Sequence, residues 1–359
     1  MTSIITRRRF NFGAGATAAT LPLIGGASAQ APLGVGFIYV GPVGDDGWTW
    51  THDQGRKAVE AAYGAKVKTS FIENIAEGPD AARAIRQLAQ AGNQLIFTTS
   101  FGFMNPTIQV AKQFPKLKFE HATGYQRADN VATYNARFYE GRAVIGTIAG
   151  HMSKSGQAGY IASFPIPEVV MGINAFTLAA QKVNPNFKTK VIWASTWYDP
   201  AKEADAAKAL IDQGADMITQ HTDSAAALQA AEQRGVFAFG QASDMKAFAP
   251  KAHLSAIVDD WSGYYIARVK DVMDGSWKTG DVWGGIKDGM VKIAPYNDAV
   301  TPAARAAADE VTKGIVAGTL HPFTGELKDL KGEVRVKAGE KASDEMLSKM
   351  DWYVEGVQA

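Results

Sequence analysis

The sequence predicts an α/β protein with two lobes, each built on a doubly wound parallel β-sheet that helices cover on both faces. Short apolar runs alternate with amphipathic segments from Leu33 onward, which is typical of buried parallel strands joined by helices. The alternation occurs twice, before and after a polar turn at 153–156. The 359 residues, 46% hydrophobic and 20% charged, suit two lobes of ~150 residues each.

Residues 1–29 have the composition of an export signal rather than of a folded element. The run Arg7-Arg8-Arg9-Phe10 precedes a mildly apolar stretch rich in Gly and Ala. The small-x-small pattern Ala27-Ser28-Ala29 then suits signal peptidase. Paired arginines before x-Phe resemble a twin-arginine (Tat) signal. The stretch is shorter than the ~20 residues of a membrane span, and its glycines disfavour the alternative of an amphipathic helix. We expect export to the periplasm and a mature chain that begins near Gln30.

The first half carries five predicted strands and three predicted helices. The strands are apolar runs of the length expected for a buried sheet, and the helices show apolar residues at helical spacing. The predicted strands are Leu33–Val40, Val67–Ile72, Leu95–Thr99, Lys118–Ala122 and Val131–Asn135. The predicted helices are Thr51–Ala62, Asp80–Gln90 and Asn105–Phe114, and a further helix, Tyr139–Met152, leads into the second half.

The second half repeats the pattern. Asp199-Pro200 provides a capping residue followed by proline in the first turn of a helix. The predicted strands are Ala158–Ala162, Val191–Ala194, Met217–Gln220 and Val236–Gly240, and the predicted helices are Glu168–Val183, Pro200–Gln213 and Ser224–Arg234. A third block, Leu254–Ile293, has a strand, a helix and a strand, and could return to the first lobe. After a helix at Thr301–Ala317, the polar segment from Phe323 is expected to wrap the surface.

Composition excludes several kinds of function. The chain has no cysteine, so a disulfide, a thiolate metal site and a lipid anchor on an N-terminal cysteine are all excluded. The formal net charge is +1, and removing residues 1–29, with three arginines and no acidic residue, leaves −2. A near-neutral chain without a basic run is a poor nucleic-acid binder. The six histidines lack ligand spacing, and no nucleotide-binding or hydrolase motif is present. We therefore expect no metal, cofactor or enzymatic activity.

The loops after the predicted strands carry most of the informative side chains. In open parallel sheets, ligands bind outside the carboxyl ends of the strands. Aromatic and hydrogen-bonding groups from both halves collect there, which suits a planar heteroaromatic ligand held between ring faces. The alternative is that the aromatic residues only pack over the sheets. The candidate ligand-binding residues are Asp45, Trp48, Thr49, Phe101, Phe164, Trp197, Gln220, Asp244 and Trp261.

Several of these stretches, in order along the chain, resemble the basic membrane protein family, whose members include purine nucleoside receptors that serve ABC importers. The resemblance extends over about 33–323. It rests on Asp45-Asp46-Gly47-Trp48-Thr49, Phe138-Tyr139-Glu140-Gly141, Val183-Asn184-Pro185, Trp197-Tyr198-Asp199-Pro200, Gln213-Gly214-Ala215-Asp216 and Gly240-Gln241-Ala242-Ser243-Asp244.

The resemblance implies that a purine is sandwiched between one aromatic side chain from each lobe, here Trp48 and Trp197. The family's sugar-binding residues are not retained. The first of two acidic positions in one family stretch falls at Ala242, although Asp244 keeps the second. A sugar-binding Lys falls within 257–260, where no Lys occurs, and a sugar-binding Asp falls near Thr123. The purine sandwich without the sugar contacts favours a nucleobase, such as adenine, over a nucleoside.

The resemblance also implies a type I periplasmic binding protein, which captures its ligand between two hinged lobes and delivers it to a membrane permease. Residues 32–150 and 255–288 are expected in lobe 1, 151–254 and 289–322 in lobe 2, and 323–359 in a C-terminal tail. We expect a monomer that is not lipid-anchored. The alternatives are a nucleoside or another small polar ligand, and a periplasmic purine-processing enzyme in which Asp45 or Glu168 would transfer protons.

Overall fold

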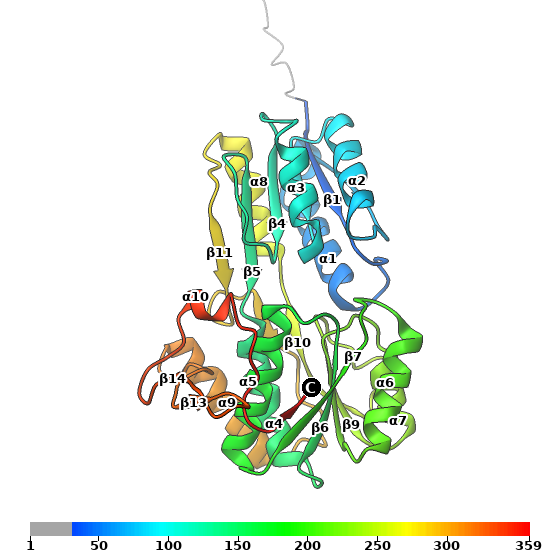
Figure 1. Ribbon diagram of the computed structural model, residues 1–359. Coiled ribbons are helices and arrows are strands. Elements are labelled where there is room, and N and C mark those ends of the chain that lie inside the picture. The colour runs from blue at the N-terminus through cyan, green and yellow to red at the C-terminus, as the bar shows by residue number, and fades with distance from the viewer. Residues whose placement is uncertain (1–30) are drawn as a thin grey trace, which may run out of the picture. The chain divides into compact units, whose positions relative to one another are not determined.

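The computed structural model describes residues 31–359, so the export signal predicted at 1–29 lies outside the described residues. Two β-sheets organise the described chain, one in each lobe (Figure 1). This confirms the predicted α/β class with two parallel-sheet lobes. Within 31–359, no helix is both long and apolar enough to cross a membrane.

The sheet of lobe 1 has six parallel strands in the order β11-β5-β4-β3-β1-β2. Phe37 packs on the side of α1 and α8, and its neighbour Ile38 packs on the side of α2 and α3, so both faces are buried. The strands are β1 (Leu33–Ile38), β2 (Val67–Ile72), β3 (Leu95–Thr98), β4 (Lys118–Ala122), β5 (Val131–Ala136) and β11 (Asp281–Gly284). The helices are α1 (Gly47–Tyr63), α2 (Pro79–Gln90), α3 (Met104–Ala111) and α8 (Ser262–Asp274), with short 3-10 turns η1 (Gly64–Lys66) and η2 (Phe101–Phe103).

The sheet of lobe 2 has the strand order β12-β10-β9-β8-β6-β7-β15, and only β12 is antiparallel to its neighbour. Helix α6 begins as predicted, because the Asp199 carboxylate accepts the Lys202 N–H at 3.1 Å. The strands are β6 (Gln157–Ala162), β7 (Lys188–Trp193), β8 (Met217–Gln220), β9 (Phe237–Gly240), β10 (His253–Asp259), β12 (Val291–Ile293) and β15 (Val357–Gln358). The helices are α4 (Phe138–Met152), α5 (Pro167–Val183), α6 (Pro200–Asp212), α7 (Ala226–Gln233) and α9 (Pro302–Ala317).

Three segments connect the lobes. The chain passes between the two sheets after β5, after β10 and after β11. The second crossing comes later than predicted, because β10 pairs in parallel with β9 and so belongs to the sheet of lobe 2. Residues 255–259 therefore lie in lobe 2 rather than in lobe 1. Residues 138–150 also lie in lobe 2 rather than in lobe 1, because α4 packs against α5, α9 and β10.

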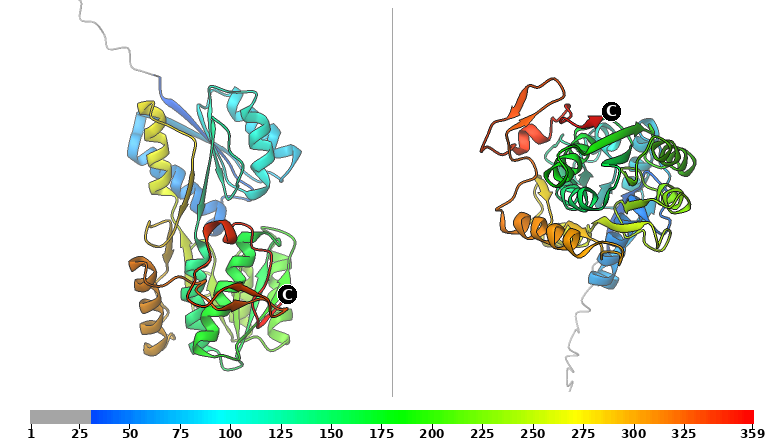
Figure 2. Two further views of the ribbon diagram at one scale, coloured as in Figure 1. Left: turned by 60° about the vertical axis from the view of Figure 1, so that its left-hand side comes forward. Right: turned by 90° about the horizontal axis from the view of Figure 1, so that it is seen from below.

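The C-terminal tail is more deeply integrated than predicted. It forms β13 (Leu327–Lys328), β14 (Val334–Val336) and α10 (Asp344–Leu347), and β15 then adds to the edge of the lobe 2 sheet beside β7 (Figure 2). The buried Asn174 of α5 donates to the Trp352 carbonyl at 2.7 Å and accepts the Val354 N–H at 3.0 Å. The segment therefore shares the core of lobe 2, although its irregular apolar spacing predicts only a surface wrap.

Candidate ligand-binding site

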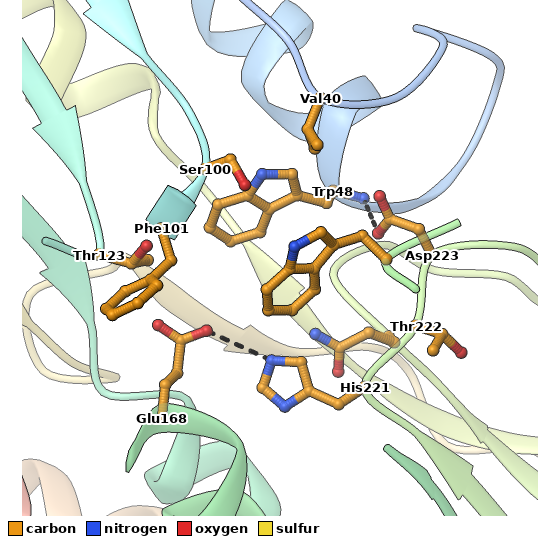
Figure 3. Close-up of a pocket in the computed structure, with 11 residues that line it drawn as sticks. Val40, Trp48, Ser100, Phe101, Thr123, Glu168, His221, Thr222 and Asp223 are labelled. Carbon is orange, nitrogen blue, oxygen red and sulfur yellow. Dashed lines mark hydrogen bonds and ion pairs between the residues drawn. The ribbon is translucent and has the colours of Figure 1, made fainter. Parts of the chain in front are cut away.

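A narrow pocket, with about 30 Å³ of free space, lies where the carboxyl ends of the strands of both lobes meet (Figure 3). Lobe 1 and lobe 2 contribute comparable numbers of side chains, so a ligand there would contact both lobes. The lining residues are Val40, Trp48, Ser100, Phe101 and Thr123 from lobe 1, and Glu168, Trp197, His221, Thr222, Asp223 and Gln241 from lobe 2.

Trp48 is held rigidly at the start of α1. Its indole Nε1–H donates to the Thr99 carbonyl at 2.7 Å, which ties the ring to the end of β3. Trp261 packs edge-on against it at 5.5 Å between ring centroids and is completely buried. His52 lies flat against Trp261, at 4.7 Å, and also contacts the Trp48 ring. The Trp48 ring is therefore supported from behind and presented to the pocket.

Trp197 enters the pocket from the loop after β7. Its Nε1–H donates across to the Glu77 carboxylate of lobe 1 at 3.2 Å. Phe164, in the loop after β6, packs against it with ring centroids 5.2 Å apart. The backbone at Ser195, two residues earlier, has a φ of 52°, a left-handed turn that bends the chain directly after the strand. Trp197 thus lines the pocket and also forms a contact between the lobes.

Two further hydrogen bonds join the lobes beside the pocket. The Trp48 N–H donates to Asp223 Oδ1 at 2.7 Å, and the Gly47 N–H donates to Ser243 Oγ at 2.8 Å. Gly47 approaches lobe 2 so closely that a Cβ atom there would lie 2.4 Å from the Asp223 carbonyl oxygen. The first turn of α1 is therefore docked tightly on lobe 2.

Carboxyl groups from both lobes meet at this seam. Burial, together with the nearby Asp45 and Glu203 carboxylates, raises the pKa of Asp46 to about 6. Burial also raises the pKa of Asp223 well above its usual range, and neighbouring Glu203 and Asp46 add to this, although the Trp48 N–H opposes it. Docking of α1 on lobe 2 therefore favours the protonated form of these acids.

At the opposite end of the pocket, Glu168 and His221 form a pair. Burial lowers the pKa of His221, so the ring is neutral, and its Nε2 lies 3.3 Å from Glu168 Oε1. Glu168 Oε2 is buried and has no hydrogen-bond partner among the described residues. This oxygen is an acceptor available to a ligand.

A buried arginine organises the floor of the site. Arg142 of α4 donates to Thr219 Oγ1 at 2.9 Å and to the Gln220 carbonyl at 2.7 Å, and it also holds the side-chain oxygen of Gln241, which lines the pocket. Burial raises the pKa of the nearby Asp259 well above its usual range. Within residues 31–359, no group of three His, Asp or Glu side chains is arranged to hold a metal ion.

The structure brings three of the nine predicted ligand-binding residues together in the pocket: Trp48, Phe101 and Trp197. Phe164 lines an adjoining opening with Trp197, and Trp261 lies behind Trp48 rather than on the pocket wall. Thr49 is buried within α1, and Asp45 is exposed in the loop before it.

The remaining two predicted residues are turned away from the pocket. The Gln220 amide donates to the Thr222 and Ser224 carbonyls at 2.8 and 2.7 Å, so it shapes the loop instead of facing a ligand. The Asp244 carboxylate lies 3.5 Å from His253 Nε2 and is 42% exposed. A side chain's position at a strand end therefore does not by itself determine whether it faces the pocket.

Sequence reasoning missed most of the polar lining. His221, Thr222 and Asp223 directly follow Gln220, the last residue of β8, so the prediction selected the right strand end but the wrong residue at it. Glu168 was considered only as a proton-transfer group of an enzyme. The signal that could have found it is its position in the first turn of α5, directly after the loop that follows β6.

Two parallel-sheet lobes, three connections and a pocket whose walls come from both lobes define a bilobal solute-binding protein. The comparisons then place it in a family. Residues 33–319 match the family described as ABC transporter substrate-binding protein, PnrA-like, and the chain belongs to this family. This confirms the resemblance deduced from the sequence, and the members are solute-binding proteins rather than enzymes.

Related proteins support this assignment. The chain is 59% identical to a purine-binding protein of Brucella abortus over 342 residues, which cover 95% of this chain and 97% of the relative. It is 37% identical to a putative ABC transporter glucose-binding protein of Haloferax volcanii, covering 93% and 82%. A solute-binding protein of an Aeropyrum pernix ABC transporter shares the fold, with a TM-score of 0.70 and 18% identity over 83% of this chain and 93% of the other.

Proposed function

We propose that the protein binds a purine between its lobes, prefers a free nucleobase such as adenine to a nucleoside, and delivers it to the permease of an ABC importer. The observation that carries the proposal is that Trp48 and Trp197, from opposite lobes, line one pocket. Aromatic faces stack on purine bases, and such stacking is worth ~1–3 kcal/mol per base in nucleic-acid proteins. The purine-binding relative at 59% identity supports the same ligand class.

The contacts across the seam support capture by closure of the lobes. Trp48 donates its backbone N–H to Asp223, and Trp197 donates its indole N–H to Glu77, each in the opposite lobe. A ligand that orders both tryptophans would therefore also favour these contacts, which couples binding to closure. A permease could distinguish the loaded protein by its closed shape.

The test is to identify the ligand and then to measure its affinity. Mass spectrometry of small molecules released from the purified protein should find a purine base. Isothermal titration of ligand-free protein should give tighter binding for adenine than for adenosine. Equal or tighter binding of adenosine would overturn the preference for the base, and binding of neither purine would overturn the proposal.

Glucose is the second candidate, because the relative at 37% identity carries that ligand in its name and aromatic side chains also pack on sugar rings. Titration with glucose in the same experiment decides between the two, and binding of glucose without adenine would favour it.

We also propose that the protein is exported by the Tat route and that it is a periplasmic monomer without a lipid anchor. The support for this proposal is the Arg7-Arg8 pair and the absence of cysteine from the sequence. Replacing both arginines by lysine should retain the precursor in the cytoplasm. Light scattering on the mature protein should give the mass of one chain.

A further inference from the structure

Glu168 stands at the boundary between the ligand pocket and a second chamber. Figure 3 shows Glu168 with Phe101 and Thr123 at one end of the pocket, opposite Asp223. The same three residues also line the second chamber, of about 240 Å³, which continues between the lobes past Asn135. A ligand with a substituent pointing toward this end could extend into the chamber only by passing Glu168.

The Glu168 carboxylate is placed to accept a hydrogen bond from a ligand. Its side chain is only 11% exposed, and His221 holds Oε1, which leaves Oε2 buried without a partner. Arg142 makes no hydrogen bond to the Glu168 carboxylate, because the terminal nitrogens of Arg142 donate to Thr219, Gln220 and Gln241 instead. A buried acceptor without a donor is costly, so a ligand that supplies an N–H at this point is strongly favoured.

We propose that Glu168 is a specificity-determining residue that selects free purine bases over nucleosides. This inference rests on the proposed function. A free purine carries an N–H on the imidazole ring at N9, where a nucleoside carries its sugar. With N9 facing Glu168, the base donates this N–H to Oε2. A nucleoside lacks the donor and directs a bulky group at the same carboxylate, so it loses the hydrogen bond and meets a steric barrier.

Two substitutions separate the hydrogen bond from the barrier. Glu168→Gln keeps the size of the side chain but removes its charge, so it should weaken adenine binding while still excluding adenosine. Glu168→Ala removes both the acceptor and the barrier and opens the way to the second chamber. It should weaken adenine binding by about 10- to 150-fold, the range for a hydrogen bond to a charged group. Adenosine binding should improve in absolute terms.

The experiment is titration of each variant with adenine, adenosine and 9-methyladenine. Glu310→Ala, at a carboxylate that is 73% exposed on α9, is the matched control and should bind all three like the parent. The parent should bind 9-methyladenine at least 10-fold more weakly than adenine, because the methyl group replaces the N–H. This difference should shrink in Glu168→Ala.

The outcomes distinguish the two proposals. If the parent prefers adenine but Glu168→Ala keeps the same ratio of adenosine to adenine affinity, the role of Glu168 is wrong and the proposed function stands. If the parent binds 9-methyladenine as well as adenine, the N–H contact is wrong. If the parent binds neither base nor nucleoside, the proposed function fails and this inference fails with it. Should Glu168→Ala not fold, unchanged adenine affinity in Glu168→Gln would still overturn the proposal.

Discussion

Gly47 offers a direct test of whether the seam between the lobes controls ligand binding. Its φ is 79°, and an added Cβ would lie 2.4 Å from the Asp223 carbonyl oxygen and 3.2 Å from its Oδ1. Cβ atoms essentially never approach other atoms within 3.0 Å, so in Gly47→Ala the first turn of α1 must withdraw by at least the difference. We expect the variant to fold but to resist closure.

The magnitude follows from the contacts that withdrawal removes. The Trp48 N–H and the Gly47 N–H donate across the seam at 2.7 and 2.8 Å, and each such bond contributes about 0.5–1.5 kcal/mol. Losing both should lower ligand affinity by roughly 5- to 150-fold. Alanine in a left-handed conformation adds about 1–2 kcal/mol of strain in any state that retains this φ.

Gly44→Ala is the matched control. Gly44 lies in the same loop with a φ of 54°, but a Cβ there would meet no atom within 4 Å. It shares the backbone strain without the clash. Titration with adenine and small-angle scattering with and without ligand provide the measurements. Gly47→Ala should bind more weakly than Gly44→Ala and show less compaction. Equal affinity and equal compaction in the two variants would refute the reasoning.

Two further predictions concern the tryptophans and pH. Trp48→Ala should lower purine affinity by about 5- to 150-fold through lost stacking. Trp197→Ala should lower the affinity further, because it also loses the hydrogen bond to Glu77. Titration of both variants checks this, and parental affinity in both would show that the two rings serve only to pack the protein. Burial raises the pKa of Asp46 to about 6 when the lobes are in contact, above its ordinary value of 3.8. Asp46 therefore binds a proton when the lobes close, and closure should become more favourable as pH falls. Affinity should rise by up to about tenfold from pH 7 to pH 5, and Asp46→Asn should flatten this profile, whereas an identical profile in the variant would exclude Asp46 as the cause.

The sequence determined the architecture because buried strands and helices require apolar residues at regular spacings, which can be recognised in the sequence. The strands Val67–Ile72, Lys118–Ala122 and Met217–Gln220 match the structure at both ends. Lys118–Ala122 and Met217–Gln220 are almost entirely buried, so nearly every residue along these runs is constrained. Val67–Ile72 is an edge strand in which Lys68 and Phe71 are exposed. Trp48 and Trp197 were also predictable, because large aromatic side chains at the ends of parallel strands are unusual outside a binding site.

Only the tertiary structure decided which polar groups line the pocket. Gln220, the last residue of β8, and His221 are adjacent in the chain, yet the Gln220 amide donates to backbone carbonyls and the ring of His221 lines the pocket. The direction of each side chain depends on contacts made by distant residues, such as Arg142 with Thr219 and Gln241. No local pattern in the sequence records these contacts.

The role of the C-terminal tail was likewise decided by tertiary contacts. Its apolar residues are irregularly spaced, so they carry no helical or strand period, but Leu347 and Val354 are buried against lobe 2. The Arg137 guanidinium, at the first connection between the lobes, binds the Asp344 carboxylate with two hydrogen bonds of 2.7 Å. A helix or strand that packs against a sheet shows a regular spacing of apolar residues in the sequence, so it can be predicted. A segment that fills gaps between elements leaves no period, because the shape of the gap sets the position of each side chain.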